Sequence, residues 1–150
     1  LDQTSVRFLE PEDMERLREL RLLDAYLDEK ETELTQWNTE LGEWAEKSPI
    51  NTRRMTNLGT FRAYALRYLR AHPGINKDLS LMVRQLQPGA TGLPLELYCF
   101  TTDTRWPVYE GVQSDIFDHL LAVLPQFDLR VFQNLSGYDL RATVALGQAR

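Results

Sequence analysis

The sequence predicts an α+β protein in which helices cover one face of an antiparallel sheet, preceded by a mostly helical, acidic segment. Three observations support this fold class. Apolar residues recur at helical spacing in two stretches after residue 51. Two runs between them alternate apolar with polar residues, as strands do. The stretch from Pro11 to about Lys47 is acidic and poor in glycine. A chain of 150 residues is long enough for one compact domain with an appendage.

The composition disfavours several classes of function. The 22 acidic residues outnumber the 17 basic ones and give a net charge of −5, which repels a nucleic acid. The single cysteine, Cys99, lies in an apolar run and has no partner for an internal disulfide, which suits a reducing cytoplasm. No stretch has the roughly 18 to 20 apolar residues of a membrane helix. The start at Leu1, without methionine, predicts a piece of a longer protein, with any membrane part upstream.

The first ten residues contain a short strand pattern. Val6 and Phe8 alternate with Arg7 within residues 4–9, and Pro11 would stop a strand there. Pro11 also suits the first turn of a helix, where the acids Glu12 and Asp13 favour the positive helix start. We therefore expect a strand followed at once by a helix.

Residues 11–50 predict helices with one apolar seam. Its members are spaced by alternating threes and fours, a heptad pattern: Leu20, Leu23, Leu27, Lys30, Leu34, Trp37, Leu41 and Trp44. The pattern fits one long helix, or two helices joined near Asp24 or Asn38. It also fits either a helical hairpin packed on its own domain or a helical contact with another subunit. Ser48-Pro49 closes the region.

The third region begins with a short extended stretch and a helix. Arg53 to Asn57 is expected to be extended, and Asn57 or Thr60 to cap the helix that follows. The apolar face of this helix runs from Leu58 to Leu69, and His72-Pro73-Gly74 ends it.

A β-hairpin and a second helix complete the region. Leu79 to Val83 and Leu93 to Cys99 alternate in polarity around a turn-rich loop. Trp106-Pro107 starts the second helix, Pro125 stops it, and Leu129 to Val131 form a closing strand. The order β-α-β-β-α-β predicts a ferredoxin-like arrangement for residues 51–137. The tail at 138–150 has no strong period.

Reactive groups are few, and the sequence predicts no catalytic, cofactor-binding or metal site. Asp115 and His119 share a helix face, but two ligands do not make a metal site, so we expect a solvent-facing charge pair. His72 is expected to have a surface role at a helix end. Cys99 is expected to be buried and unreactive. No glycine-rich phosphate motif and no nucleophile elbow occurs.

A local basic cluster raises the question of RNA binding. It consists of Arg53, Arg54, Arg62, Arg67 and Arg70. Its arginines are interleaved with Phe61, Tyr64 and Tyr68. RNA-binding modules with the same element order carry a basic-Gly-aromatic pattern on their third strand. The corresponding run here is L-P-L-E-L-Y-C-F, with Glu96 among the exposed positions. We therefore expect the arginines to pair with acids of a neighbouring subunit and not with nucleic acid.

Several segments resemble a known family in order and spacing. They include N-T-R-R-M-T-N-L-G-T-F-R-A-Y, Y-L-R-A-H-P, L-M-V-R-Q-L-Q-P, G-L-P-L-E-L-Y-C-F and D-I-F-D-H-L-L-A-V-L-P. Together they resemble the C-terminal cytoplasmic domain of MscS-type mechanosensitive channels, miniconductance subgroup. By this resemblance, residues 1–10 would be the last strand of an upstream β-domain and 11–50 a helical insertion.

The resemblance implies a homo-oligomer, a heptamer in this family, whose cytoplasmic parts enclose a vestibule below a pore in the bacterial inner membrane. Ions and small osmolytes would cross when tension opens the pore after hypo-osmotic shock, and the membrane would be reached only through upstream residues. By the same resemblance, this chain is not expected to be an enzyme. The candidate vestibule or subunit-contact charges are Arg53, Arg54, Arg62, Arg67, Arg70, Glu96, Asp103, Arg105 and Glu110; the candidate helical contact seam is Leu27, Leu34, Trp37, Leu41 and Trp44.

Two other functions fit the predicted fold. A ferredoxin-like domain can be a ligand-binding regulatory module, since a fold does not fix a function. It can also be a small enzyme of acylphosphatase type that holds a phosphate with arginine. The sequence has no glycine-rich loop after its first expected strand, which disfavours the enzyme.

Overall fold

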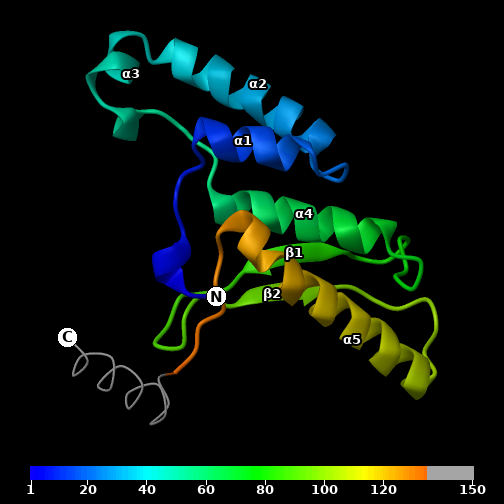
Figure 1. The fold of residues 1–150 in the computed structure, drawn as a ribbon. Helices are drawn as coiled ribbons and strands as arrows, with labels where there is room; N and C mark the ends of the chain where they lie inside the picture. The colour runs from blue at the N-terminus through cyan, green and yellow to red at the C-terminus, as the bar shows by residue number, and fades with distance from the viewer. Residues whose placement is uncertain (135–150) are drawn as a thin grey trace, which may run out of the picture.

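Helix α4 (Asn57–Ala71) is the central element of the computed structural model, which describes residues 1–134 (Figure 1). Its residues Leu58, Phe61 and Leu69 are all buried. The cap is Thr56, whose hydroxyl accepts a hydrogen bond from the amide of Gly59 at 3.0 Å. The expectation of Asn57 or Thr60 as the cap was wrong, because both side chains are buried and bonded elsewhere.

The sheet has two antiparallel strands, β1 (Met82–Gln85) and β2 (Leu95–Tyr98). Val83 pairs with Leu97, and both side chains face the helices. Arg84 pairs with Glu96, and these two form an ion pair on the other face. The predicted hairpin is therefore confirmed, with the polarity that the alternation indicated.

Helix α5 (Trp106–Val123) covers β2 and continues into the short 3₁₀ helix η3 (Leu124–Phe127). Ile116 and Leu120 are buried in the core, as their helical spacing predicted. The α-helix ends two residues before Pro125, and the chain then makes one 3₁₀ turn through the proline. Asp128, at φ 52°, ends that turn in the left-handed region.

The first nine residues do not form the expected continuous strand at 4–9. The side chain of Asp2 accepts a hydrogen bond from the amide of Thr4 at 2.9 Å and starts a 3₁₀ helix, η1 (Gln3–Ser5). Beyond it, Phe8 makes a single antiparallel bridge to Thr56. The segment expected as the first strand, Arg53 to Asn57, therefore lies beside the N-terminal segment and not beside the hairpin.

The closing strand expected at Leu129 to Val131 makes one backbone bond to the N-terminal segment, from the amide of Asp2 to the carbonyl of Arg130 at 2.8 Å. Of the four strands expected after residue 51, residues 1–134 thus form two. The fold class is α+β, as predicted, and the ferredoxin-like strand order is not established by these residues.

The helical segment contains α1 (Pro11–Arg18), α2 (Asp24–Glu40), α3 (Glu43–Lys47) and a 3₁₀ helix, η2 (Pro49–Asn51). Of the alternatives left open for this segment, two helices joined near Asp24 is correct, because α2 begins there. The helical path is interrupted again after Asn38, at Leu41 and Gly42, between α2 and α3. Gly42 has φ 56°, a conformation that favours glycine and ends α2.

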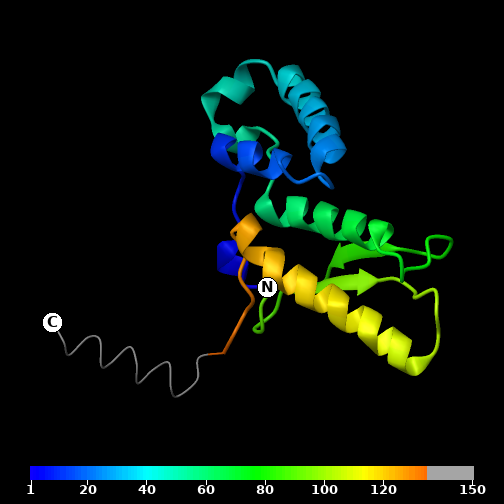
Figure 2. The ribbon, with the colours of Figure 1, turned by 45° about the vertical axis from the view of Figure 1, so that its right-hand side comes forward.

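Helices α1 and α2 lie on the side of α4 away from the strands (Figure 2). Leu17, Leu23 and Leu27 are almost fully buried and join the core cluster that includes α4. In the described part of the chain, 1–134, no helix is long and apolar enough to cross a membrane. The tail predicted at 138–150 lies outside the described residues.

Candidate functional site

A cluster of four charged residues joins three parts of the chain that are far apart in sequence. Arg7, on the N-terminal segment, contacts Asp13 in the first turn of α1 at 2.5 Å and Asp128 after η3 at 2.6 Å. Arg16 contacts the same two carboxylates, at 2.9 Å and 2.8 Å. Two arginines thus bridge two aspartates and hold residues 7, 13 and 128 together. No local sequence pattern predicts this cluster, because its members are up to 121 positions apart.

The cluster keeps its carboxylates charged. Hydrogen bonds from Arg7 lower the pKa of Asp13 to about 2, against the opposing effect of burial, and the amide of Glu10 adds to the lowering. Hydrogen bonds from Arg16 and then Arg7 also lower the pKa of Asp128. A general acid or base works best with a pKa near the working pH. These two carboxylates are therefore suited to structural ion pairs and not to proton transfer.

Asn57 connects the same region through its buried amide. Its Nδ2 donates to the carbonyl of Ser5 at 2.8 Å and to that of Phe127 at 3.1 Å. Its Oδ1 accepts from the amides of Arg7 at 3.0 Å and Leu58 at 2.8 Å. The side chain is 0% exposed, so all four bonds replace water. Asn57 was expected to be a helix cap, and the structure gives it this longer-range role instead.

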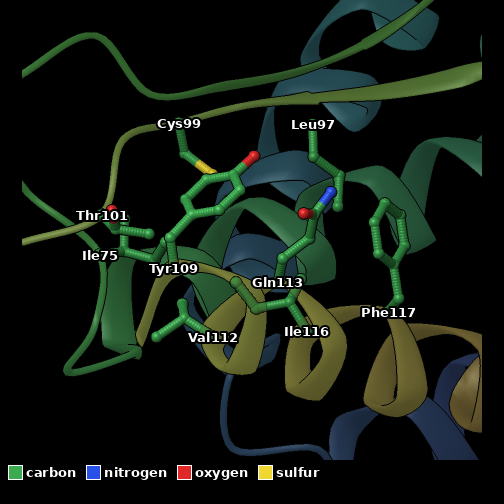
Figure 3. Close-up of a pocket in the computed structure, with 9 residues that line it drawn as sticks. All are labelled: Ile75, Leu97, Cys99, Thr101, Tyr109, Val112, Gln113, Ile116 and Phe117. Atoms are coloured by element: carbon green, nitrogen blue, oxygen red, sulfur yellow. The ribbon is translucent and has the colours of Figure 1, made fainter. Parts of the chain in front are cut away.

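A small cavity lies between β2 and α5 (Figure 3). Leu97 and Cys99 contribute from the strand side, and Val112, Ile116 and Phe117 from the helix. Its volume is about 100 Å³, well below the roughly 300–1,000 Å³ of typical ligand pockets. Burial raises the pKa of the Cys99 thiol and so reduces the fraction of nucleophilic thiolate. This agrees with the expected packing role, although Cys99 is only partly buried.

His119 is part of an aromatic group between α4 and α5. Its Nε2 lies 2.8 Å from the hydroxyl of Tyr64, and its ring stacks on Tyr68 with centroids 4.1 Å apart. The expected solvent-facing pair with Asp115 was therefore wrong, because the imidazole turns toward the tyrosines of the neighbouring helix. His72 ends α4, where its Nδ1 accepts from the amide of Gly74 at 3.1 Å.

The described residues offer no candidate metal site. No group of three or more His, Cys, Asp or Glu side chains within residues 1–134 is placed to hold a metal ion.

Two of the predicted surface arginines pair within the chain. Arg53 contacts Glu33 of α2 at 2.7 Å and lies 5.6 Å from the ring of Trp37. Arg54 contacts Glu10 at 3.1 Å and stacks over the ring of Phe8 at 4.8 Å. Each of these two arginines thus has an acid partner within its own chain, and a contact with acids of a neighbouring subunit stays a prediction. They fasten the linker before α4 to the helical segment and to the N-terminal segment.

The other predicted charges divide into paired and unpaired groups. Asp103 pairs with Arg105 at 2.6 Å, and Glu96 pairs with Arg84 across the hairpin. Arg67 lies 5.0 Å from the ring of Tyr26. Among the nine predicted charges, three are exposed and make no ion pair to any residue in 1–134: Arg62, Arg70 and Glu110.

The predicted helical contact seam is buried at one end and exposed at the other. Leu27 and Leu34 are 0% and 8% exposed, so the first half packs on its own chain. Leu41 is half-buried, while Trp37 and Trp44 are 37% and 61% exposed. Packing within the chain thus accounts for the first half of the seam, and the two tryptophans remain as candidate contacts.

The fold and these surfaces define an α+β domain in which several ion pairs join segments that are distant in sequence. Comparison with known families gives its identity. Residues 47–131, more than half of the chain, match the sequence model of the C-terminal part of the mechanosensitive ion channel MscS. The chain belongs to this family. No solved structure matches it. MscS channels are membrane channels and not enzymes, are generally homo-oligomeric, and have a cytoplasmic C-terminal domain.

Proposed function

We propose that this chain is the cytoplasmic vestibule domain of a mechanosensitive channel of the miniconductance subgroup, which opens under membrane tension in hypo-osmotic shock. The family match over residues 47–131 carries the proposal. In the assembled channel, the domain would belong to a homo-oligomer, a heptamer, in the bacterial inner membrane and would face the cytoplasm. Ions and small osmolytes would pass it on the way to or from the pore.

In this role the domain is a wall whose surface charge sets the local concentration of ions. A fixed charge acts on passing ions most strongly when no opposite charge lies beside it. Arg53, Arg54 and Arg105 have carboxylate partners that offset their fields. Arg62, Arg70 and Glu110 are the better candidates, because within residues 1–134 no ion pair offsets them. The proposal therefore narrows the nine predicted charges to these three.

The finer description of the fold belongs to the same proposal. We infer a ferredoxin-like domain at 51–137, an upstream β-domain ending within 1–10, a helical insertion at 11–50 and a C-terminal tail at 138–150. The insertion agrees with helices α1 to α3, most of which lie outside the matched residues.

The alternative functions have less support. A regulatory module needs an enclosed ligand pocket. The two cavities beside α5 measure about 100 Å³ and about 190 Å³, both smaller than typical ligand sites. The larger hollows, of about 470 to 530 Å³, are wide open to solvent. A phosphatase of acylphosphatase type needs an arginine free to hold phosphate, but Arg53 and Arg54 are paired with Glu33 and Glu10. A thermal-shift screen with amino acids and nucleotides tests the module, because a ligand selective for the folded state raises Tm.

Patch-clamp recording of the full-length protein, in cells without other tension-gated channels, tests the proposed function. We expect tension-activated currents, and improved survival of the cells after hypo-osmotic shock. The double variant Arg62→Glu/Arg70→Glu should keep the tension threshold but shift the cation-to-anion permeability ratio toward cations. Arg21→Glu, an exposed arginine outside the matched residues, is the matched control. A full-length protein that gives no tension-activated current would overturn the proposal.

A further inference from the structure

The backbones of Leu1 and Leu93 exchange two hydrogen bonds. The nitrogen of Leu1 donates to the carbonyl of Leu93 at 2.7 Å, and the amide of Leu93 donates to the carbonyl of Leu1 at 2.8 Å. A reciprocal pair of this kind is the unit of an antiparallel ladder. Leu93 lies two residues before β2, so the chain at Leu1 is placed to run antiparallel to that strand.

The Leu1–Leu93 pair lies on the edge of β2 opposite to β1. The register pairs Arg84 with Glu96, and the amide of Leu86 bonds the carbonyl of Pro94 at 3.0 Å. Because backbone groups alternate along a strand, Pro94 and Glu96 bond toward β1, whereas Leu93, Leu95 and Leu97 direct theirs to the other edge. Among residues 1–134, no strand lies along this edge, which we call the free edge of β2.

An apolar groove lies directly beneath the free edge. Leu95 and Leu97 line it from the strand, and Leu120 and Leu121 line it from α5, around a volume of about 190 Å³. Leu121 is 52% exposed at its mouth. A strand added along the edge would place every second side chain in this groove, so the groove selects apolar residues at alternate positions.

The residues on both sides of the free edge leave room for the backbone at Leu1 and bond to it. A Cβ on Gly92, which has φ 90°, would lie 2.3 Å from the carbonyl oxygen of Leu1, so only glycine permits this approach. On the other side, the amide of Asp2 bonds the carbonyl of Arg130 at 2.8 Å, and Val131 lines the groove. A strand continuing through Leu1 would therefore lie between β2 and residues 129–131.

We propose that the free edge of β2 binds an extended polypeptide strand that enters through Leu1, runs antiparallel to β2 and carries an apolar side chain at every second position. The register follows from the Leu1–Leu93 pair. The second residue before Leu1 lies opposite Leu95, and the fourth lies opposite Leu97. This strand occupies the central place that a ferredoxin-like sheet gives to its first strand. It replaces in that role the strand expected at 53–57, where Thr56 pairs with Phe8, and it moves the end of the inferred upstream β-domain to a point before this strand. The inference does not depend on a channel function.

The test compares two six-residue extensions of equal composition attached before Leu1. Val-Thr-Val-Thr-Val-Thr places valine in the groove, and Thr-Val-Thr-Val-Thr-Val places it outside, because a shift of one residue exchanges the two faces. We expect the first extension alone to raise Tm by about 4 °C or more and to slow amide exchange at Leu95 and Leu97 roughly tenfold.

Substitutions in the groove and beside Leu1 sharpen the comparison. Leu121→Lys places a charge in the groove and should remove the rise in Tm that the first extension gives. Trp106→Lys, at a residue 76% exposed and outside the groove, should not. Gly92→Ala should also remove this rise in Tm, because the added methyl group displaces Leu1.

Three outcomes would overturn the proposal. The first is that the two extensions have equal effects on Tm and on amide exchange. The second is that the amides of Leu95 and Leu97 are already protected in the unextended chain at low concentration, which would show that another part of this chain binds the edge. The third is that their protection appears only as the unextended chain dimerises, which would make a second copy the occupant.

Discussion

Arg7 and Asp13 are joined by two side-chain hydrogen bonds, from Nη1 to Oδ2 at 2.5 Å and from Nη2 to Oδ1 at 2.9 Å. Asp13 also accepts the amide of Glu10 at 2.9 Å, so the same carboxylate caps the start of α1. A two-pronged arginine contact fixes orientation as well as distance. The pair therefore sets the direction in which α1 leaves the N-terminal segment.

This pair predicts a loss of stability in acid. The pKa of Asp13 is lowered from 3.8 to about 2 in the folded protein. A lowered folded pKa gives stability that is fully present above pH 3.8 and is lost as pH falls through about 2. At 1.36 kcal/mol for each pKa unit, the contribution is roughly 2 kcal/mol. Urea unfolding between pH 2 and 6 should show this decline, to which Asp128 adds with the same sign.

The variant Asp13→Asn should be less stable at pH 6 and should show a shallower decline of stability between pH 4 and 2. Asp118→Asn removes an exposed carboxylate that has no ion pair within residues 1–134, and should keep the slope. Equal slopes in the two variants would show that Asp13 is not the titrating group.

Removal of the Asn57 amide should destabilise the protein strongly. Asn57→Ala leaves the carbonyls of Ser5 and Phe127 and the amide of Arg7 without their partner in a buried site. Unsatisfied buried groups cost about 1–3 kcal/mol each, partly relieved by water, so we expect a loss on the order of 3 kcal/mol. Urea unfolding at neutral pH measures the free energy of unfolding.

Asn51→Ala is the matched control, because Asn51 is exposed and its side chain bonds only the carbonyl of Trp44 among residues 1–134. It should change stability by less than about 0.5 kcal/mol. Similar losses in the two variants would contradict a connecting role for Asn57.

Local patterns in the sequence were sufficient to predict helices α4 and α5 and the hairpin, whereas the number of helices within 11–50 was left open. Val83 and Leu97 were placed on the inner face by alternation, and Ile116 and Leu120 by helical spacing, and all four pack against the core. These predictions depend on neighbours within a few positions, where one period decides which face is apolar. Proline and glycine also marked the ends of elements, as at His72-Pro73-Gly74.

Contacts between distant segments were not predictable in this way. No local signal connects Arg7 with Asp128, and Asn57 resembled an ordinary helix cap because asparagine is common there. The partners of Arg53 and Arg54 were also ambiguous, since charge alone does not say whether an acid lies on the same chain or on a neighbour. Strand pairing failed for the same reason: Thr56 pairs with Phe8, 48 positions earlier, and not with the hairpin.

The two ends of the helical seam should respond differently to truncation. Leu27→Ala should cost about 3 kcal/mol, because Leu27 is 0% exposed in the core and its loss leaves a cavity. Trp44→Ala should change the stability of the isolated chain by less than about 1 kcal/mol, since Trp44 is 61% exposed and contacts Lys47 at the surface. A large loss in the Trp44 variant would show that this end of the seam packs within the chain.

Alkylation of Cys99 should be slow, with a midpoint at raised pH. Burial raises the pKa of this thiol, and only the thiolate attacks iodoacetamide, so the pH at half-maximal rate should exceed that of ordinary cysteine. The same chain in urea is the control, because unfolding exposes the thiol and should return the midpoint to its ordinary value. A midpoint in the folded protein at or below that of the unfolded chain would mean that Cys99 is activated, and would reopen a reactive role for the cavity between β2 and α5.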